Sequence, residues 1–173
     1  ISFLFLGPSS MLSAVSALGA QNIGAGKQER AIASLRYAVL ITVGFGVLVS
    51  ILIQFTAGPI VSLFTEGADV IRLGSQYLRG YIRGYIWDCI FAGVHFSFSG
   101  YFCACGKSVL SFLHNILSIS LVRIPGVYLT SKMFQTTLFP MGLATAAGSL
   151  MSVVICVIAF YVIYHKQQKV KGA

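Results

Sequence analysis

A long apolar stretch without a single charged residue, Tyr37 to Ala57, constrains this chain more than any other feature. About 20 apolar residues are enough for a helix to cross the hydrocarbon core of a bilayer. No water satisfies backbone N–H and C=O groups there, so only helices and closed barrels can span it. Hydrophobic residues make up 57% of the chain and charged residues only 9%, which excludes an ordinary soluble domain. We therefore predict an all-α integral membrane protein.

The same reasoning predicts about five membrane spans joined by short connections. A Gly58-Pro59 pair follows the second span and is predicted to break the helix. After it, apolar residues recur at helical spacing, which predicts a short helix at the membrane interface. The chain begins with Ile1 in an apolar run, and we interpret it as the back part of a longer protein. The predicted spans are approximately 1–20, 37–57, 84–106, 108–128 and 138–164, with the interfacial helix at 60–78 and a tail at 165–173.

Basic residues gather in the connections on one side of the predicted bundle. The loop after the first span, the loop at Lys107 and the carboxyl tail lie on that side and contain most of the Lys and Arg. Cytoplasmic loops are enriched in these residues, so the carboxyl terminus is predicted to be cytoplasmic in a cell membrane. The bilayer thus explains the net charge of +8, and no nucleic acid partner is implied.

Asp88 is the candidate functional residue of the third span. A carboxylate in hydrocarbon is costly, so it is expected to face a protein interior or a wet cavity and to act there. At 3.6 residues per turn, Tyr85, His95 and Ser99 share one stripe with Asp88. This stripe offers cation ligands and a proton acceptor to an inner cavity. The alternative is a carboxylate that is paired with Arg123, or capped by Tyr hydroxyls, only to hold helices together.

The fourth span repeats this pattern with His114, Asn115 and Arg123 as further cavity or substrate candidates. Arg123 precedes Pro125 and lies deep enough to need a partner, unless its long side chain reaches the interface. Small residues that recur at helical spacing predict helix-packing faces in the first and fifth spans. They are Ser9, Ser13, Ser16 and Ala20, and Gly142, Ala146 and Ser149.

No pattern in the chain predicts a metal site or a cofactor. Cys103 and Cys105, considered together with His95 and His114, do not have the spacing of zinc sites. The glycines that precede Lys27 do not have the spacing of a phosphate-binding loop. A membrane-embedded metalloenzyme is nevertheless an alternative, and a metal analysis of the purified protein would test it.

Six stretches of the chain, from residues 20–31 through Asp88 to residues 141–145, together resemble the multidrug and toxic compound extrusion (MATE) family of efflux transporters, in its bacterial form. The stretch that contains Gln21, Asn22, Gly24 and Gly26 looks like the loop after the family's eighth helix. Asp88 and the residues after it are similar to the tenth helix and its following loop. The resemblance covers nearly the whole chain in the right order, through residues 20–31, 88, 96–102, 105–108, 122–125 and 141–145.

The resemblance implies a twelve-helix antiporter made of two six-helix lobes, of which this chain supplies helices eight to twelve. The missing amino-terminal lobe would be its partner. Family members export cationic, often aromatic, drugs in exchange for Na⁺ or H⁺, and an acid of the tenth helix contributes to a cation site, for which Asp88 is the candidate. A flippase for lipid-linked oligosaccharides of the same superfamily is the alternative, and it would be expected to have a more cationic cavity.

Overall fold

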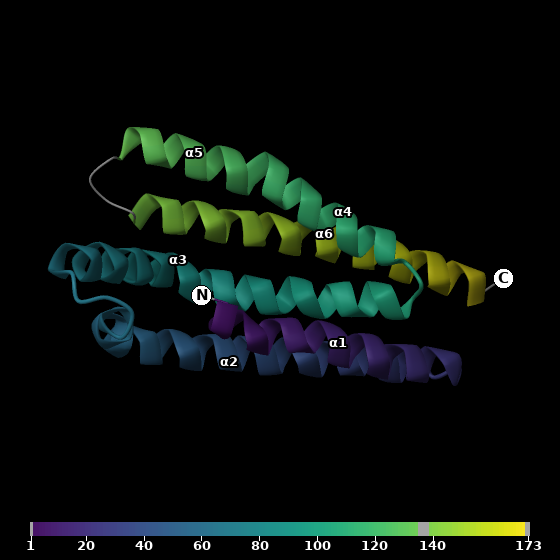
Figure 1. The fold of residues 1–173 in the computed structure, drawn as a ribbon. Helices are drawn as coiled ribbons and strands as arrows, with labels where there is room; N and C mark the ends of the chain where they lie inside the picture. Colours follow the sequence, from purple (N-terminus) through teal and green to yellow (C-terminus); the bar gives the residue numbers. More distant parts are fainter. Residues whose placement is uncertain (1, 135–138, 172–173) are drawn as a thin grey trace.

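The computed structural model describes residues 2–134 and 139–171, and within them it contains helices and short turns but no strand. This confirms the prediction of an all-α chain. Helices α4, η1 and α5 follow one another without a break and form one long, bent helix (Figure 1). The elements are α1 Ser2–Gly24, α2 Gln28–Ser62, α3 Ala68–Ala104, α4 Ser108–Ser118, the π-helix η1 Ile119–Arg123, α5 Ile124–Met133 and α6 Phe139–Lys171.

Helix α3 lies in the centre of the bundle. It packs against α1 and α2 on one side and against α6 on the other, and α4 contacts both α3 and α6 (Figure 1). The core contains small and aromatic side chains, including Ala38 on α2, Phe102 on α3 and Cys156 on α6. Because α3 is covered on both sides, polar residues along it must find partners within the protein.

Two glycines allow α3 to approach its neighbours closely. A methyl group added at Gly100 would lie 2.5 Å from the carbonyl oxygen of Leu12 on α1. One added at Gly93 would lie 2.6 Å from Cβ of Thr42 on α2. Small residues are the usual means by which membrane helices bring their backbones together.

The buried face of α1 differs from the predicted one. Pro8, Val15 and Gly19 are buried, whereas Ser9, Ser13 and Ala20 are exposed and Ser16 is half-buried. Serines at helical spacing therefore did not identify the packing face, because their small size fits a close contact without requiring one. On α6 the prediction was correct for Ala146 and Ser149, which are both buried.

The turns after α1 and α3 have the same construction. Gly26 and Gly106 adopt φ of +72° and +70°, a conformation in which a Cβ would be strained. After α1, the Lys27 N–H donates to the Asn22 carbonyl at 2.8 Å and the Gly26 N–H to the Ile23 carbonyl at 3.0 Å. The same two bonds recur after α3, and they complete a Schellman motif that satisfies the last carbonyls of each helix.

The predicted interfacial helix at residues 60–78 is not a separate element. Helix α2 continues through Pro59 to Ser62, and α3 begins at Ala68, so the segment is divided between two helices and a turn. Pro59 lacks one donor but lies in the last turns of α2, where the helix can bend without ending. Figure 1 shows the carboxyl end of α2 turning away from the axis of its longer part. The predicted tail is likewise continuous with α6 as far as Lys171.

Within the described residues, three helices are long and apolar enough to cross a membrane: Gln28–Val49, Ser108–Met133 and Leu143–Tyr164. A shorter apolar segment, Ile90–Ala104, lies in α3 beside them. Large apolar side chains also point outwards, including Leu40, Phe55 and Val109 at 67%, 82% and 67% exposure. So large an apolar exterior is expected where lipid, not water, is the solvent.

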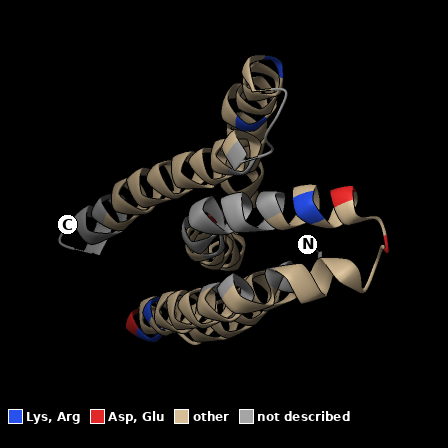
Figure 2. Cartoon of the chain, turned by 90° about the vertical axis from the view of Figure 1, so that its left-hand side faces the viewer, with Lys and Arg blue, Asp and Glu red and all other residues tan. Residues whose placement is uncertain are grey.

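Charged residues occupy only a few places on the described helices, which are otherwise tan in Figure 2. The turns after α1 and α3 lie at the same end of the bundle as the carboxyl end of α6 (Figure 1). This agrees with the grouping of basic segments that the sequence predicts. The turn between α2 and α3 lies at the opposite end.

Candidate functional site

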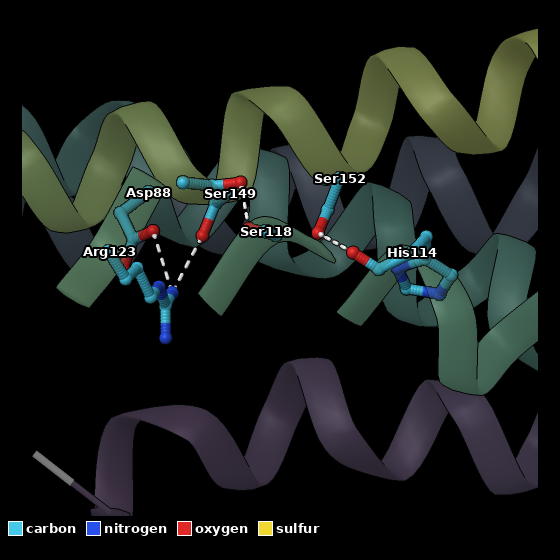
Figure 3. Close-up of polar contacts among 7 residues, drawn as sticks. Asp88, His114, Ser118, Arg123, Ser149 and Ser152 are labelled. Carbon is cyan, nitrogen blue, oxygen red and sulfur yellow. Dashed lines mark hydrogen bonds and ion pairs between the residues drawn. The ribbon is translucent and has the colours of Figure 1, made fainter. Parts of the chain in front are cut away.

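A row of polar side chains lies between α3 on one side and α4, η1 and α6 on the other. Each member is buried except Arg123, which is half-buried. We call this row the polar seam, and Figure 3 shows most of it. Its members are Asp88, His95, Ser99, His114, Ser118, Arg123, Ser149 and Ser152.

Asp88 and Arg123 form an ion pair at one end of the seam. Arg123 Nη2 lies 3.6 Å from Asp88 Oδ1, and the two side chains are 33% and 0% exposed. The same Nη2 donates to Ser149 Oγ at 2.8 Å, so it bridges α3 and α6 (Figure 3). Asp88 is thus a fully buried carboxylate whose neighbours come from two other elements of the bundle.

Two histidines occupy the other end of the seam. The rings of His95 and His114 lie edge to face with their centroids 5.6 Å apart. His114 Nε2 shares a hydrogen bond with Ser99 Oγ at 2.7 Å, and Ser152 Oγ donates to the His114 carbonyl at 3.4 Å. These contacts tie α3, α4 and α6 together through buried polar groups.

The middle of the seam is formed by η1 and the part of α6 that faces it. Ser118 Oγ donates to the carbonyl of Gly148, which joins the start of η1 to α6. Gly148 also makes room for Arg123, because a methyl group there would lie 2.5 Å from Arg123 Cγ. A π-helix widens the backbone by one residue per turn, and such segments are frequent at functional sites.

The structure brings together five of the predicted site residues: Asp88, His95, Ser99, His114 and Arg123. It does not add Asn115, which is exposed because it lies about 100° around the helix from His114. The backbone of Tyr85 belongs to α3, but its side chain lies outside the described part of the structure.

The four residues of the family-like loop do not belong to the seam: Gln21, Asn22 and Gly24 form the last turn of α1, and Gly26 lies in the turn that follows. Asn22 Nδ2 donates to the Leu18 carbonyl at 2.7 Å, and the Gln21 carbonyl accepts from the Ala25 N–H at 3.1 Å. Both contacts are local to the carboxyl end of α1.

Sequence reasoning did not identify the two seam residues of α6, Ser149 and Ser152. Ser149 was predicted only as a small packing residue, although it accepts the hydrogen bond of Arg123. Ser152 lies three positions later, so both serines face the same side of α6. That spacing was the available signal, but serine is also common where helices merely pack.

In the described structure Asp88, His95 and Ser99 contact residues of α4 and η1, whereas the sequence predicts that their stripe faces an inner cavity. A groove of about 910 Å³ does exist, and apolar and aromatic side chains of α2, α3 and α6, such as Val39, Phe98 and Phe160, line most of it. None of its lining residues belongs to the seam. Among the described residues, no three His, Cys, Asp or Glu side chains lie close enough to hold a metal ion.

The chemistry that the seam offers is that of oxygen ligands beside one negative charge. A carboxylate and neighbouring hydroxyls are ligands for a hard cation such as Na⁺, and the carboxylate alone can accept a proton. A buried ionisable group in a membrane-spanning protein marks an ion or substrate pathway by default.

Comparisons with known proteins agree with this architecture. No curated protein and no solved structure matches the chain. The model of the MatE family matches residues 1–129, which include α1, α2, α3, η1 and Asp88. Because the match covers well over half of the 173 residues, it identifies the family. This membrane protein therefore belongs to the MatE family of transporters.

Proposed function

We propose that this chain is most of the carboxyl-terminal lobe of a multidrug antiporter in the cell membrane, with its carboxyl terminus in the cytoplasm. The complete transporter would export cationic, often aromatic, compounds in exchange for Na⁺ or H⁺ by alternating access. Asp88 would bind the coupling cation. The family supports transport in general, and the residues of the polar seam support this particular assignment.

The observation that carries the proposal is the complete burial of Asp88 at the centre of the bundle, on α3. A charge in this position destabilises the protein unless a counter-charge or a ligand compensates it. Arg123 supplies a counter-charge in the described structure, and a coupling cation would supply it in turn and bind the two conformations of the transporter differently. Such differential binding is what any coupling between two ligands requires.

The alternatives have less support in the described residues. A flippase for pyrophosphate-linked lipids needs uncompensated positive charge, whereas Arg123 is balanced by Asp88. A metalloenzyme needs a cluster of ligands, and the described part of the chain has no such group.

The test uses two carboxylates of the same helix. In the full-length transporter reconstituted in liposomes, Asp88→Asn should abolish export of a cationic dye driven by a Na⁺ or H⁺ gradient. Asp69→Asn is the matched control, because its side chain is 90% exposed and paired with Arg72 at the membrane edge. It should export at the wild-type rate. Wild-type export by Asp88→Asn, at equal protein in the liposomes, would sink the assignment.

A further inference from the structure

We propose that Arg123 is a built-in competitor of the coupling cation, which occupies Asp88 when the cation is absent and leaves when it binds. The inference rests on the proposed function of Asp88 and adds a role for a residue on another helix.

The first argument is the looseness of the ion pair. Charge-assisted bonds between a guanidinium and a carboxylate are normally about 2.7–2.9 Å long and often bidentate. Here Nη2 and Oδ1 are 3.6 Å apart. In addition, Nε of Arg123 is buried and finds no hydrogen-bond acceptor among the described residues. A pair that served only to hold α3 against η1 would be expected to be shorter and better satisfied.

The second argument is charge balance. Asp88 carries one negative charge and can compensate one positive charge. A cation bound to Asp88 would lie within a few ångströms of the guanidinium, where two like charges repel strongly in a partly buried site. Arg123 and the coupling cation therefore exclude each other. The side chain of Arg123 is 33% exposed and thus has room to move, whereas Asp88 is enclosed.

The third argument is that the structure supplies a second anchor and a hinge for Arg123. Ser149 accepts from Nη2 at 2.8 Å and can keep this contact while the guanidinium swings away from Asp88. Arg123 is the last residue of η1, where the Ile124 N–H donates to the Ile119 carbonyl five residues earlier. Conversion of this π turn to an α turn would rotate Arg123 relative to α3 and would move the guanidinium away from Asp88.

Removal of the competitor should strengthen cation binding. In liposomes that hold the full-length transporter, Arg123→Gln should lower the half-saturating concentration of the cation that drives the wild type, Na⁺ or H⁺. A decrease of about fivefold or more is expected, the lower end of typical coupling between two ligands. Besides Asp88 and Arg123, the titratable side chains in the described seam are His95 on α3 and His114 on α4. Both remain in the variant, so they do not account for a shift.

The chain offers a matched control and a second variant. Arg72→Gln breaks an exposed pair with Asp69 of nearly equal length, 3.5 Å, and should leave the half-saturating concentration unchanged. If Arg123→Gln does not fold, Gly148→Ala keeps the arginine but displaces it, and it should shift the concentration in the same direction.

An unchanged or higher half-saturating concentration in the folded variants would overturn the inference. The two proposals can fail separately. If Asp88→Asn abolishes export but loss of Arg123 leaves cation affinity unchanged, Asp88 remains the cation site and only the competitor role is refuted. If Asp88→Asn exports normally, both proposals fail.

Discussion

The close approach of α1 and α3 can be tested by adding one methyl group at Gly100. In Gly100→Ala the new carbon would lie 2.5 Å from the carbonyl oxygen of Leu12 and 3.0 Å from Cβ of Val15. Nonbonded atoms prefer about 3.5–4.0 Å, so the two helices must separate by roughly 1 Å. The obstacle is backbone, which cannot rotate away as a side chain can. Overpacking of this kind destabilises a protein by about 1–3 kcal/mol.

A second glycine isolates that steric effect. Alanine favours a helix over glycine by about 1 kcal/mol at any interior position. The stability change of Gly100→Ala alone would therefore combine this gain in helix propensity with the loss from the steric clash. Gly44 also lies within a helix, and a methyl group there meets nothing within 4 Å. Gly44→Ala should therefore be neutral or slightly stabilising. The difference between the two variants should be about 1–3 kcal/mol, with Gly100→Ala the less stable.

The measurement is the free energy of unfolding in mixed detergent micelles, followed by circular dichroism as a denaturing detergent is added. The wild type and both variants are compared at the same protein concentration. Equal free energies for Gly100→Ala and Gly44→Ala would show that α1 and α3 are not in contact at this point. The described packing of α3 against α1 would then be wrong.

Two further predictions concern the seam and the orientation. Ser99→Ala should destabilise the protein by about 1–3 kcal/mol in the same assay, because it leaves buried His114 Nε2 without its 2.7 Å partner. Ser10→Ala, which removes only an exposed bond within α1, should have little effect, and equal losses would contradict the burial argument. In a cysteine-free background, a cysteine at Glu66 should react with an impermeant reagent from outside intact cells. One at Gly24 should react only after permeabilisation, and the reverse pattern would invert the proposed orientation.

The helical class and most helix positions were predictable from the sequence. Apolar runs of membrane-spanning length leave the backbone no alternative partners, so the helix at Tyr37 to Ala57 needed no tertiary information. The end of α1 was also readable, because Gly26 supplies the positive φ that a Schellman turn requires. The interfacial helix was the failure. The Gly58-Pro59 pair predicts a break in the helix, but α2 continues through Pro59 to Ser62. A proline in the last turns of a helix can bend the helix without ending it.

The candidate site was predictable in part. Helical periodicity placed Asp88, His95 and Ser99 on one face of α3, and the structure confirms that all three are buried. Their partners were less accessible. The sequence left open whether Asp88 binds a cation or pairs with Arg123. It predicted Ser149 only as a small packing residue, although Ser149 accepts the hydrogen bond of Arg123. Periodicity describes one helix at a time and contains no information about which face of the next helix is opposite.

The sequence by itself determined that this chain forms membrane helices, because hydrocarbon denies the backbone any partner except its own. It also placed a carboxylate, Asp88, within a membrane-spanning segment. Only the tertiary structure decided what that carboxylate meets. The rotation and depth of η1 and α6 relative to α3 depend on contacts such as that between Gly148 and Arg123. A Cβ added to Gly148 would lie 2.5 Å from Arg123 Cγ. Those contacts join residues far apart in the chain, and they exist only once the helices have packed.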